Sequence, residues 1–265
     1  MKPLKPNRKK QMNPPKNNER KQIRLNRFLA ISGIDSRRKC DHYILEGRVK
    51  VNGETVERLG ERIDPEKDRV TFDGKPVKAA QNFVYILLNK PLHTVTTVSD
   101  ERKRRTVIDI LNLPRRLFPV GRLDFNTTGA LLITNDGDLA YFLMHPKFEV
   151  KKTYRVMLDG LIRPVDLHHF RNGIVMDGRK TAPCKVKELR RIDNCSFLEV
   201  ELHEGRNRQI RRMFEMLGYQ VETLNRVNFA GLNVNDLKPG EWRELTRGEV
   251  QRLKKMVETY KERMK

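Results

Sequence analysis

Apolar residues first recur with a helical period just after residue 22. One apolar stripe starts at Leu25 and predicts a short helix, and a second stripe follows a capping position at Asp35-Ser36 and predicts another helix. The chain then alternates between polar and apolar residues around Asn52-Gly53, and a further turn follows at Asp73-Gly74. Such dipeptides are strong signals for tight β-hairpins. We therefore expect residues 23–82 to form a small domain of two helices and two hairpins.

From residue 83 the apolar runs become nearly continuous. The run 83–91 ends in proline and predicts a central strand that is buried on both sides, and Ala130 to Ile133 predicts a second buried strand, which a turn at 135–137 closes. The other expected elements are strands at 152–158, 184–189 and 197–203 and helices at 138–144 and 165–171. This order suits antiparallel hairpins better than alternating βαβ units. Residues 83–250 are therefore expected to form an α+β domain with a mixed, mainly antiparallel sheet.

The last part of the chain carries a helix signal of its own. Thr246 is followed three residues later by Glu249, which is a capping box. The apolar side of the predicted helix consists of Val250, Leu253, Val257 and Tyr260. We assign residues 251–265 to this C-terminal helix.

The charge of the chain narrows the choice of partner. The net charge is +21, and residues 1–22 alone hold eight Lys or Arg, four prolines and one glutamate. That segment has too few apolar residues to fold alone, so we expect a disordered basic arm, which is either a solvated tail or a loose attractor of phosphate. A chain this basic, without a long apolar span or a secretory signal, is expected to meet a polyanion in the cytoplasm rather than a membrane.

Little in the chain suits a metal or a cofactor. Cys40, Cys184 and Cys195 are far apart and form no Cys-x-x-Cys pair, so we interpret them as ordinary reduced thiols. The six histidines show no ligand spacing, and no Gly-rich phosphate loop is present. We expect neither a metal nor a cofactor.

A lone acid stands out in the stretch 118–137. Asp124 lies between Arg122 and a Thr-Thr-Gly turn that leads into the buried strand, so we expect it on a loop anchored against the core. A carboxylate there needs a hydrogen bond or a cation, because an unpaired buried charge is costly. Loop chemistry alone leaves Asp124 as a turn-capping residue, and only the rest of the chain favours a chemical role.

A second notable stretch is 204–218. It predicts a helix that Asn207 caps and Gly218 ends, and four arginines crowd its first turns, Arg206, Arg208, Arg211 and Arg212. Positive charges at a helix N-terminus are unfavourable unless nearby anions neutralise them. Arg211 is expected to be partly buried and so to need a carboxylate, for which Asp124 is the conspicuous candidate.

The order of elements in residues 23–82 resembles the S4 RNA-binding domain. The resemblance rests on a helix, a turn, a Ser-Arg-Arg-Lys helix and a Val-Lys-Val-Asn-Gly hairpin. The cations at the start of the second helix oppose the helix dipole, which indicates either a phosphate partner or a solvated basic face. The resemblance implies that four cations face structured RNA, namely Arg37, Arg38, Lys39 and Lys50.

Four motifs further along are similar in order and spacing to those of the RNA pseudouridine synthases. They are Gly121-Arg-Leu-Asp124, Thr128-Gly129-Ala-Leu-Leu, Lys152-Thr-Tyr154 and Gly205-Arg-Asn-Arg-Gln-Ile-Arg211. The nearest branch of that family carries an N-terminal S4 domain and modifies ribosomal RNA. The likeness covers about residues 23–250 and implies the fold outlined above.

The resemblance also implies roles for individual residues. Asp124 is the catalytic aspartate, Tyr154 stacks on the target base, and Arg211 pairs with Asp124. Arg122 helps to hold the flipped nucleotide, and Lys90-Pro91 is a structural motif beside the site. From its alternating strand alone, Tyr154 is an ordinary core aromatic. We also expect RNA contacts from Arg206, Arg208 and Ile210.

The implied reaction is the isomerisation of uridine to pseudouridine in ribosomal RNA, which we expect to be 23S rRNA. It involves no net redox change and no energy input, in agreement with a chain that lacks a nucleotide motif. The expected partner is ribosomal RNA or a precursor of a ribosomal subunit, with no DNA, and a monomer is the default. The alternatives are a non-catalytic RNA-binding ribosome-assembly factor and a DNA-binding regulator built on the two short helices. The first leaves Asp124, Tyr154 and Arg211 unexplained, and the hairpin after the helices argues against the second.

Overall fold

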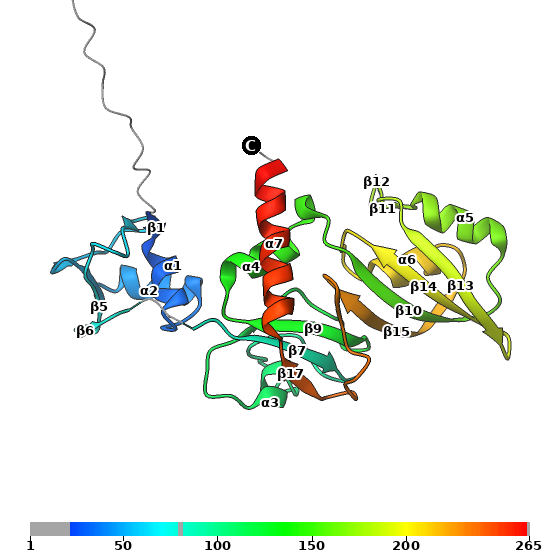
Figure 1. Cartoon of the computed structure of the whole chain (residues 1–265), viewed down its shortest axis with the longest axis horizontal. Coiled ribbons are helices and arrows are strands. Elements are labelled where there is room, and N and C mark those ends of the chain that lie inside the picture. The colour runs from blue at the N-terminus through cyan, green and yellow to red at the C-terminus, as the bar shows by residue number, and fades with distance from the viewer. Residues whose placement is uncertain (1–21, 79–81, 264–265) are drawn as a thin grey trace, which may run out of the picture. The chain divides into compact units, whose positions relative to one another are not determined.

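The computed structural model describes residues 22–78 and 82–263 (Figure 1). The predicted basic arm, apart from its last residue, lies outside the described residues. Contacts divide the chain into two compact units, one up to residue 80 and one from residue 81 onward. None of the helices in the described ranges combines the length and the apolar character that crossing a membrane requires.

The N-terminal unit contains the predicted helices and hairpins. Its helices are α1 (Leu25–Ile31) and α2 (Arg37–Leu45), and Ser36 caps α2 by accepting a hydrogen bond from the backbone N–H of Lys39 at 3.2 Å. One four-stranded sheet has the order β3-β2-β5-β6, and a separate pair joins β1 to β4. The strands are β1 (Ile23–Arg24), β2 (Val49–Val51), β3 (Glu54–Thr55), β4 (Arg62–Ile63), β5 (Val70–Phe72) and β6 (Lys75–Pro76).

The second unit is built on a nine-stranded mixed sheet with the main order β13-β14-β10-β15-β9-β7-β17. Outside this main order, β16 pairs with β15 and β8 pairs with β9. Among its described strands, β15 pairs with β9 in parallel and the other pairings are antiparallel. The sheet strands are β7 (Tyr85–Lys90), β8 (Phe118–Pro119), β9 (Thr128–Thr134), β10 (Lys152–Asp159), β13 (Lys185–Ile192), β14 (Cys195–Leu202), β15 (Gln220–Phe229), β16 (Leu232–Asn233) and β17 (Trp242–Glu244). A short hairpin of β11 (Val175–Met176) and β12 (Arg179–Lys180) lies apart from the sheet.

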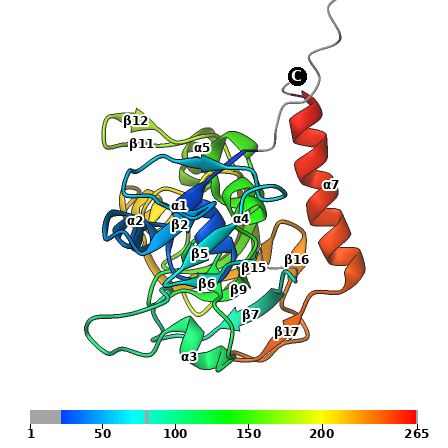
Figure 2. The same ribbon diagram turned by 90° about the vertical axis from the view of Figure 1, so that its left-hand side faces the viewer.

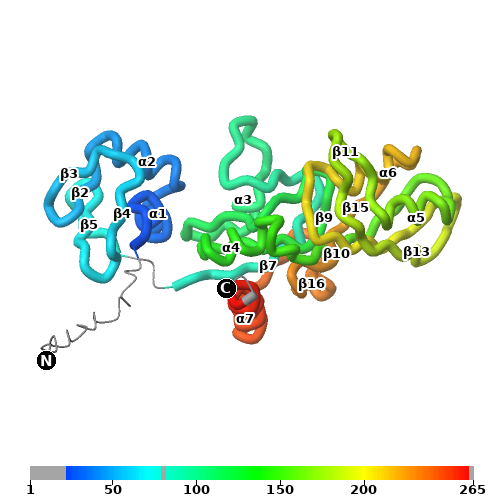
Figure 3. The backbone as a smooth tube through the Cα atoms, turned by 90° about the horizontal axis from the view of Figure 1, so that it is seen from above, coloured from blue at the N-terminus to red at the C-terminus, as the bar shows by residue number. Residues whose placement is uncertain are grey.

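The helices of this unit gather at its two ends (Figures 1 and 3). They are α3 (Val107–Leu111), α4 (Gly137–Met144), the 3-10 turn Pro146–Phe148, α5 (Pro164–Asn172), α6 (Gln209–Glu215) and α7 (Arg247–Arg263). Helices α3, α4 and α7 lie near β7 and β9, and α5 and α6 lie near β13 and β14. At the second end, Phe170 of α5 and Phe214 of α6 stack with ring centres 4.2 Å apart.

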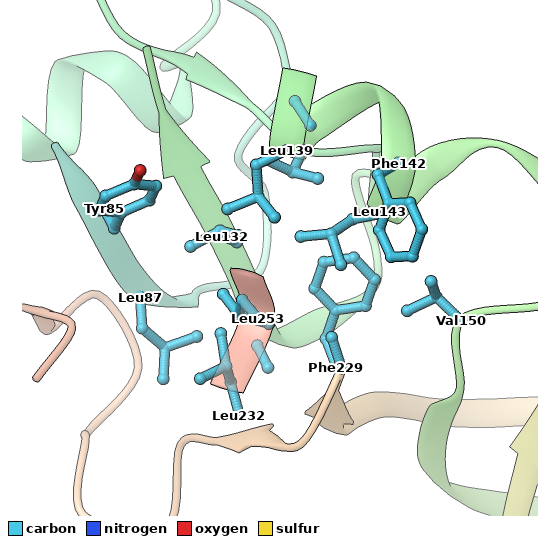
Figure 4. Packing of buried hydrophobic residues seen from close by; sticks show 14 of the residues in the cluster. Tyr85, Leu87, Leu132, Leu139, Phe142, Leu143, Val150, Phe229, Leu232 and Leu253 are labelled. Atoms are coloured by element: carbon cyan, nitrogen blue, oxygen red, sulfur yellow. The ribbon is translucent and has the colours of Figure 1, made fainter. Parts of the chain in front are cut away.

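The two central strands are buried on both sides, as their apolar runs predict. Leu87 and Leu132 belong to one core, which Figure 4 shows, while Ile86 and Ile133 belong to a second core beneath α3. Successive residues of a strand point to opposite faces, so a strand covered on both sides must be apolar throughout. Leu253 of α7 packs into the first core, and α7 runs along one side of the unit (Figure 2). The strands that carry the site are thus held from both faces.

The C-terminal helix begins with the predicted capping box. The Thr246 backbone N–H donates to the Glu249 carboxylate at 2.8 Å, and the Glu249 N–H donates to the Thr246 hydroxyl at 3.3 Å. Arg243 holds the same carboxylate at 2.7 Å, and this hydrogen bond lowers the pKa of Glu249 to about 2. The helix starts at Arg247, so residues 247–250, which we assigned to the preceding domain, belong to it.

Candidate active site

The loop that carries Asp124 is fastened to its neighbours on both sides of the acid. The Thr96 hydroxyl donates to the Leu123 carbonyl at 2.8 Å and accepts from the Leu123 N–H at 3.3 Å. Three residues after Asp124, the Thr127 N–H donates to the Asp124 carbonyl at 3.0 Å and closes a turn. The His93 N–H reaches the Phe125 carbonyl at 3.0 Å. The backbone around Asp124 is therefore fixed without any help from its side chain.

The Asp124 carboxylate itself is half-buried and has no hydrogen-bond or ion-pair partner among the described residues. Because it caps no turn, the turn-capping interpretation does not hold. The expectation that a nearby partner satisfies it is also wrong, since the carboxylate opens into a cleft. An acid left without a partner in a cleft is a candidate for chemistry rather than for stability.

A buried lysine lies below this loop. The Lys90 side chain is fully buried, and its ammonium donates to the carbonyls of Pro91 at 3.0 Å and Thr127 at 2.9 Å. Burial lowers the pKa of Lys90 to about 8, and the charge of Asp124 opposes that shift. Lys90 thus ties the strand β7 to the loop and places a positive charge near Asp124.

Arg211 supports the same loop in a different way from the one predicted. Its guanidinium donates to the Asn126 carbonyl at 2.8 Å and to the Val221 carbonyl at 2.7 Å, and its Nε is buried without a partner. The expected direct ion pair with Asp124 does not form, and the two Nη groups donate to main-chain carbonyls instead. Burial lowers the pKa of Arg211, and the charge of Asp124 opposes this. The interaction with the acid is therefore through space.

Tyr154 lies in β10 and is half-buried. Its ring packs against two of the cores and also borders the cleft, so both interpretations of this residue describe part of its setting. In the sheet its Cα partners are Val200 of β14 and Arg226 of β15. Strand pairing on both sides gives the ring a rigid support at the edge of the cleft.

The cleft brings together most of the predicted site residues. It has a volume of about 300 Å³, and the predicted residues that line it are Arg122, Asp124, Tyr154, Arg206, Arg208 and Ile210. Arg211 lies under the loop and does not line it. Arg37, Arg38, Lys39 and Lys50 belong to the other unit, where all four are exposed and Lys39 pairs with Asp35 at 3.4 Å.

The start of α6 differs from the prediction. Arg208, in the left-handed region at φ +48°, stands at the N-cap, and no side chain caps the helix, so Asn207 as a cap was wrong. The turn is closed instead by the Gln209 side chain, which accepts from the Arg206 N–H at 3.0 Å. The arginines point apart: Arg206 donates to two main-chain carbonyls, and Arg212 pairs with Asp177 at 2.6 Å.

Two cations of the cleft were not predicted. Lys152 opens β10 and is half-buried, and Arg226 of β15 is 3% exposed. Lys152 belongs to a motif quoted above, but nothing in the alternation of β15 distinguishes Arg226 from a solvated arginine. No group of three or more His, Cys, Asp or Glu within the described ranges is placed to hold a metal ion.

Comparison with known proteins identifies the family of this chain. A family model described as RNA pseudouridylate synthase matches residues 84–216. The chain belongs to the RNA pseudouridylate synthase family. An S4 domain model matches residues 23–70. As in the expectation from the sequence, this pseudouridine synthase has an N-terminal S4 domain followed by an α+β domain with a mainly antiparallel sheet.

Several similar proteins align with most of the length of this synthase. The ribosomal large subunit pseudouridine synthase B of Bacillus subtilis is 42% identical over 89% of this chain and 97% of its own. The dual-specificity RNA pseudouridine synthase RluF of Escherichia coli is 35% identical over 89% of this chain and 80% of its own. A solved pseudouridylate synthase structure superimposes with a TM-score of 0.63 and 30% identity, over 87% of this chain and 99% of that one.

Proposed function

We propose that this protein isomerises a specific uridine to pseudouridine in the ribosomal RNA of the large subunit, 23S rRNA, and that it does so in the cytoplasm as a monomer. The family assignment supports the reaction, and the name of the Bacillus subtilis relative supports the choice of substrate. In this proposal the S4 unit attracts the RNA through its exposed cations, and the second unit carries out the chemistry. The RNA is free or part of a ribosomal precursor.

The observation that carries the proposal is the unpartnered carboxylate of Asp124 in the cleft. Lys90 and Arg211 place positive charges near this carboxylate without bonding to it. Because Asp124 lines the cleft, its carboxylate is able to act at the ribose of a nucleotide that has left the RNA stack. The backbone on either side is held by hydrogen bonds, between Thr96 and Leu123 and from the Thr127 N–H to the Asp124 carbonyl, so the loop is in place before the substrate arrives.

The reaction needs the base to be held while it turns. The N1–C1′ bond of uridine breaks, the detached uracil rotates, a C5–C1′ bond forms, and the proton lost from C5 is balanced by the proton gained at N1. We assign to Tyr154 the aromatic face on which the base stacks during this rotation. Ile210, which is buried at the cleft wall, supplies an apolar surface beside it, and Arg122 and Arg208 supply charges for the RNA backbone.

Purified protein and unmodified rRNA transcripts test the proposal. We expect the wild-type protein to form pseudouridine at one position of the large-subunit transcript and at none of the small-subunit transcript. Pseudouridine in the small-subunit transcript alone would contradict the substrate. Tight binding of both transcripts without any pseudouridine would favour the non-catalytic alternative.

A further inference from the structure

Two cations at the floor of the cleft have no part in holding Asp124. Lys152 and Arg226 both line the cleft, and the charge of Arg226 contributes to lowering the pKa of Lys152 to about 8, after burial. Two like charges in a half-enclosed place repel each other and lose hydration. Their presence together is unfavourable unless an anion joins them.

Arg226 is fixed in position by the sheet. Its Cα partners are Tyr154 of β10 on one side and Gly129 of β9 on the other. Its Nε donates to the Ala130 carbonyl at 2.8 Å, and the guanidinium carbon lies 4.7 Å from the centre of the Phe229 ring. Its Nη2 is buried and has no partner among the described residues. An arginine that is 3% exposed, lines the cleft and keeps a donor without a partner is a candidate for binding a ligand there.

Among the described residues, no carboxylate forms an ion pair with Lys152 or Arg226. Glu204 acts on Lys152 through space, but its carboxylate accepts hydrogen bonds from the Ala182 N–H and the Gln209 amide and forms an ion pair with Arg206 at 3.5 Å. The Lys152 ammonium donates only to the Val150 carbonyl, at 3.0 Å, and so keeps two of its three donors. The pair therefore keeps unused N–H donors at the cleft.

We propose that Lys152 and Arg226 form a subsite for one phosphodiester of the target nucleotide, and so anchor it while its base lies against Tyr154. This inference rests on the proposed function, because it takes RNA as the substrate. Every nucleotide of an RNA brings one phosphate, and an unused guanidinium donor beside an ammonium matches its oxygens. Arg226 lies across the strand pairing from the base-stacking Tyr154, and Lys152 lies two residues before Tyr154 on the same strand. The sugar is then held between the subsite and Tyr154, toward Asp124.

Neutral phosphate analogues test the subsite directly. The probe is a synthetic RNA that covers the uridine modified in the transcript experiment, with a methylphosphonate at the linkage on its 5′ or its 3′ side, in separate molecules. Dissociation constants are measured in the Asp124→Asn background, where turnover does not interfere. The variant is Lys152→Gln, and the matched control is Lys151→Gln, because Lys151 is the exposed neighbour that reaches Glu201 at 3.5 Å. Arg226→Gln is a second variant, included if its thermal unfolding matches that of the wild type.

At one of the two linkages, the uncharged analogue should bind about tenfold more weakly than the normal RNA to the Asp124→Asn protein and to the Lys151→Gln control. The Lys152→Gln variant should bind the analogue less than threefold more weakly than the normal RNA, because this variant already lacks the lysine contact to the phosphate. Equal losses in Lys152→Gln and the control at both linkages would overturn the proposal. So would a Lys152→Gln variant that lowers only kcat and leaves RNA affinity unchanged, since the pair would then act on the departing uracil. If the wild-type protein makes no pseudouridine in the normal RNA, it is the proposed function that fails.

Discussion

The cations of the N-terminal unit and those of the cleft differ in how the fold holds them. Arg37, Arg38 and Lys50 are exposed on a small domain, whereas two of the cations that line the cleft are withdrawn from solvent: Lys152 is half-buried and Arg226 is 3% exposed. Exposed charges are hydrated and screened by salt, so each contributes little and they act through their number. Buried charges act over short distances from fixed positions. The first arrangement suits the attraction of RNA, and the second suits the placement of a single nucleotide.

The largest effect that this comparison predicts is at Asp124. Asp124→Asn keeps the size of the side chain and removes its charge, so turnover should fall by roughly 10² to 10⁴-fold or more. RNA affinity should stay within about threefold of the wild type, because most of the binding comes from phosphate contacts elsewhere. Single-turnover rates and dissociation constants on the same rRNA transcript separate the two quantities. A parallel loss of both would remove Asp124 from the chemistry.

A glycine beside the cleft should be far less replaceable than one in the N-terminal unit. Gly129 has φ +108°, and a Cβ there would lie 2.2 Å from the Arg226 carbonyl oxygen. Gly74 has φ +75° in a hairpin turn with nothing within 4 Å of its Cβ position. Gly129→Ala should lower the free energy of unfolding by about 2–4 kcal/mol, and Gly74→Ala by about 1 kcal/mol.

Urea unfolding of the two variants checks this difference. Where the two units unfold independently, the urea curve should also show a separate transition for the second unit. Similar losses for the two glycines would mean that β9 and β15 can move apart easily, and the cleft would then not be a rigid site.

The pH dependence of stability should distinguish the cleft lysine from an exposed one. The pKa of Lys152 is lowered to about 8 in the folded protein, against about 10.5 in an unfolded chain. Between these values the unfolded state binds more protons, so the contribution of Lys152 makes the folded state more stable as pH rises from about 8 toward 10. Lys152→Gln lacks this contribution.

The free energy of unfolding of Lys152→Gln, relative to the wild type, should therefore fall as the pH is raised from 7.5 to 9.5, as followed by urea titrations. Lys151→Gln should keep a constant difference from the wild type over the same range. If the difference in unfolding free energy from the wild type did not change with pH for either variant, Lys152 would be as well hydrated as Lys151.

The smallest effect is expected in the N-terminal unit. Changing Arg37 and Arg38 together to Ala should weaken RNA binding by a few-fold and reduce the slope of log K against log salt by about 1 to 2, which corresponds to two lost phosphate contacts. Arg58→Ala is the control, because Arg58 is an exposed arginine of the same unit that pairs with Glu61 at 2.7 Å. An unchanged slope in the double variant would remove this face of α2 from the RNA contact.

Local patterns predicted most of the fold. The apolar runs of β7 and β9, the Asn52-Gly53 turn and the Thr246–Glu249 capping box all act between residues that are close in the chain or on neighbouring strands, so their pattern is visible in the sequence. The predicted cap of α6 was wrong: Arg208 stands at the N-cap in the left-handed region, and no side chain caps the helix. Propensity ranks capping residues, but it does not show which side chain reaches the turn.

The interior of the site was less predictable than its outline. Asp124 and Tyr154 could be placed in one site by their motifs, and the cleft contains both. The donors of Arg211 instead go to main-chain carbonyls, which carry no signal of their own in a sequence. Arg226 became noticeable only when strand pairing put it opposite Tyr154 and burial left its Nη2 unpartnered. Contacts between distant strands therefore account for most of what the sequence did not predict.

The most direct test of the central claim is a map of pseudouridine in ribosomal RNA from three kinds of cell: cells with this protein, cells without it, and cells that produce only the Asp124→Asn form. We predict that one large-subunit pseudouridine disappears both in the deletion and in the Asp124→Asn cells. An unchanged map accompanied by a defect in ribosome assembly would contradict the account, because the protein would then act by binding RNA and Asp124 would have no chemical role.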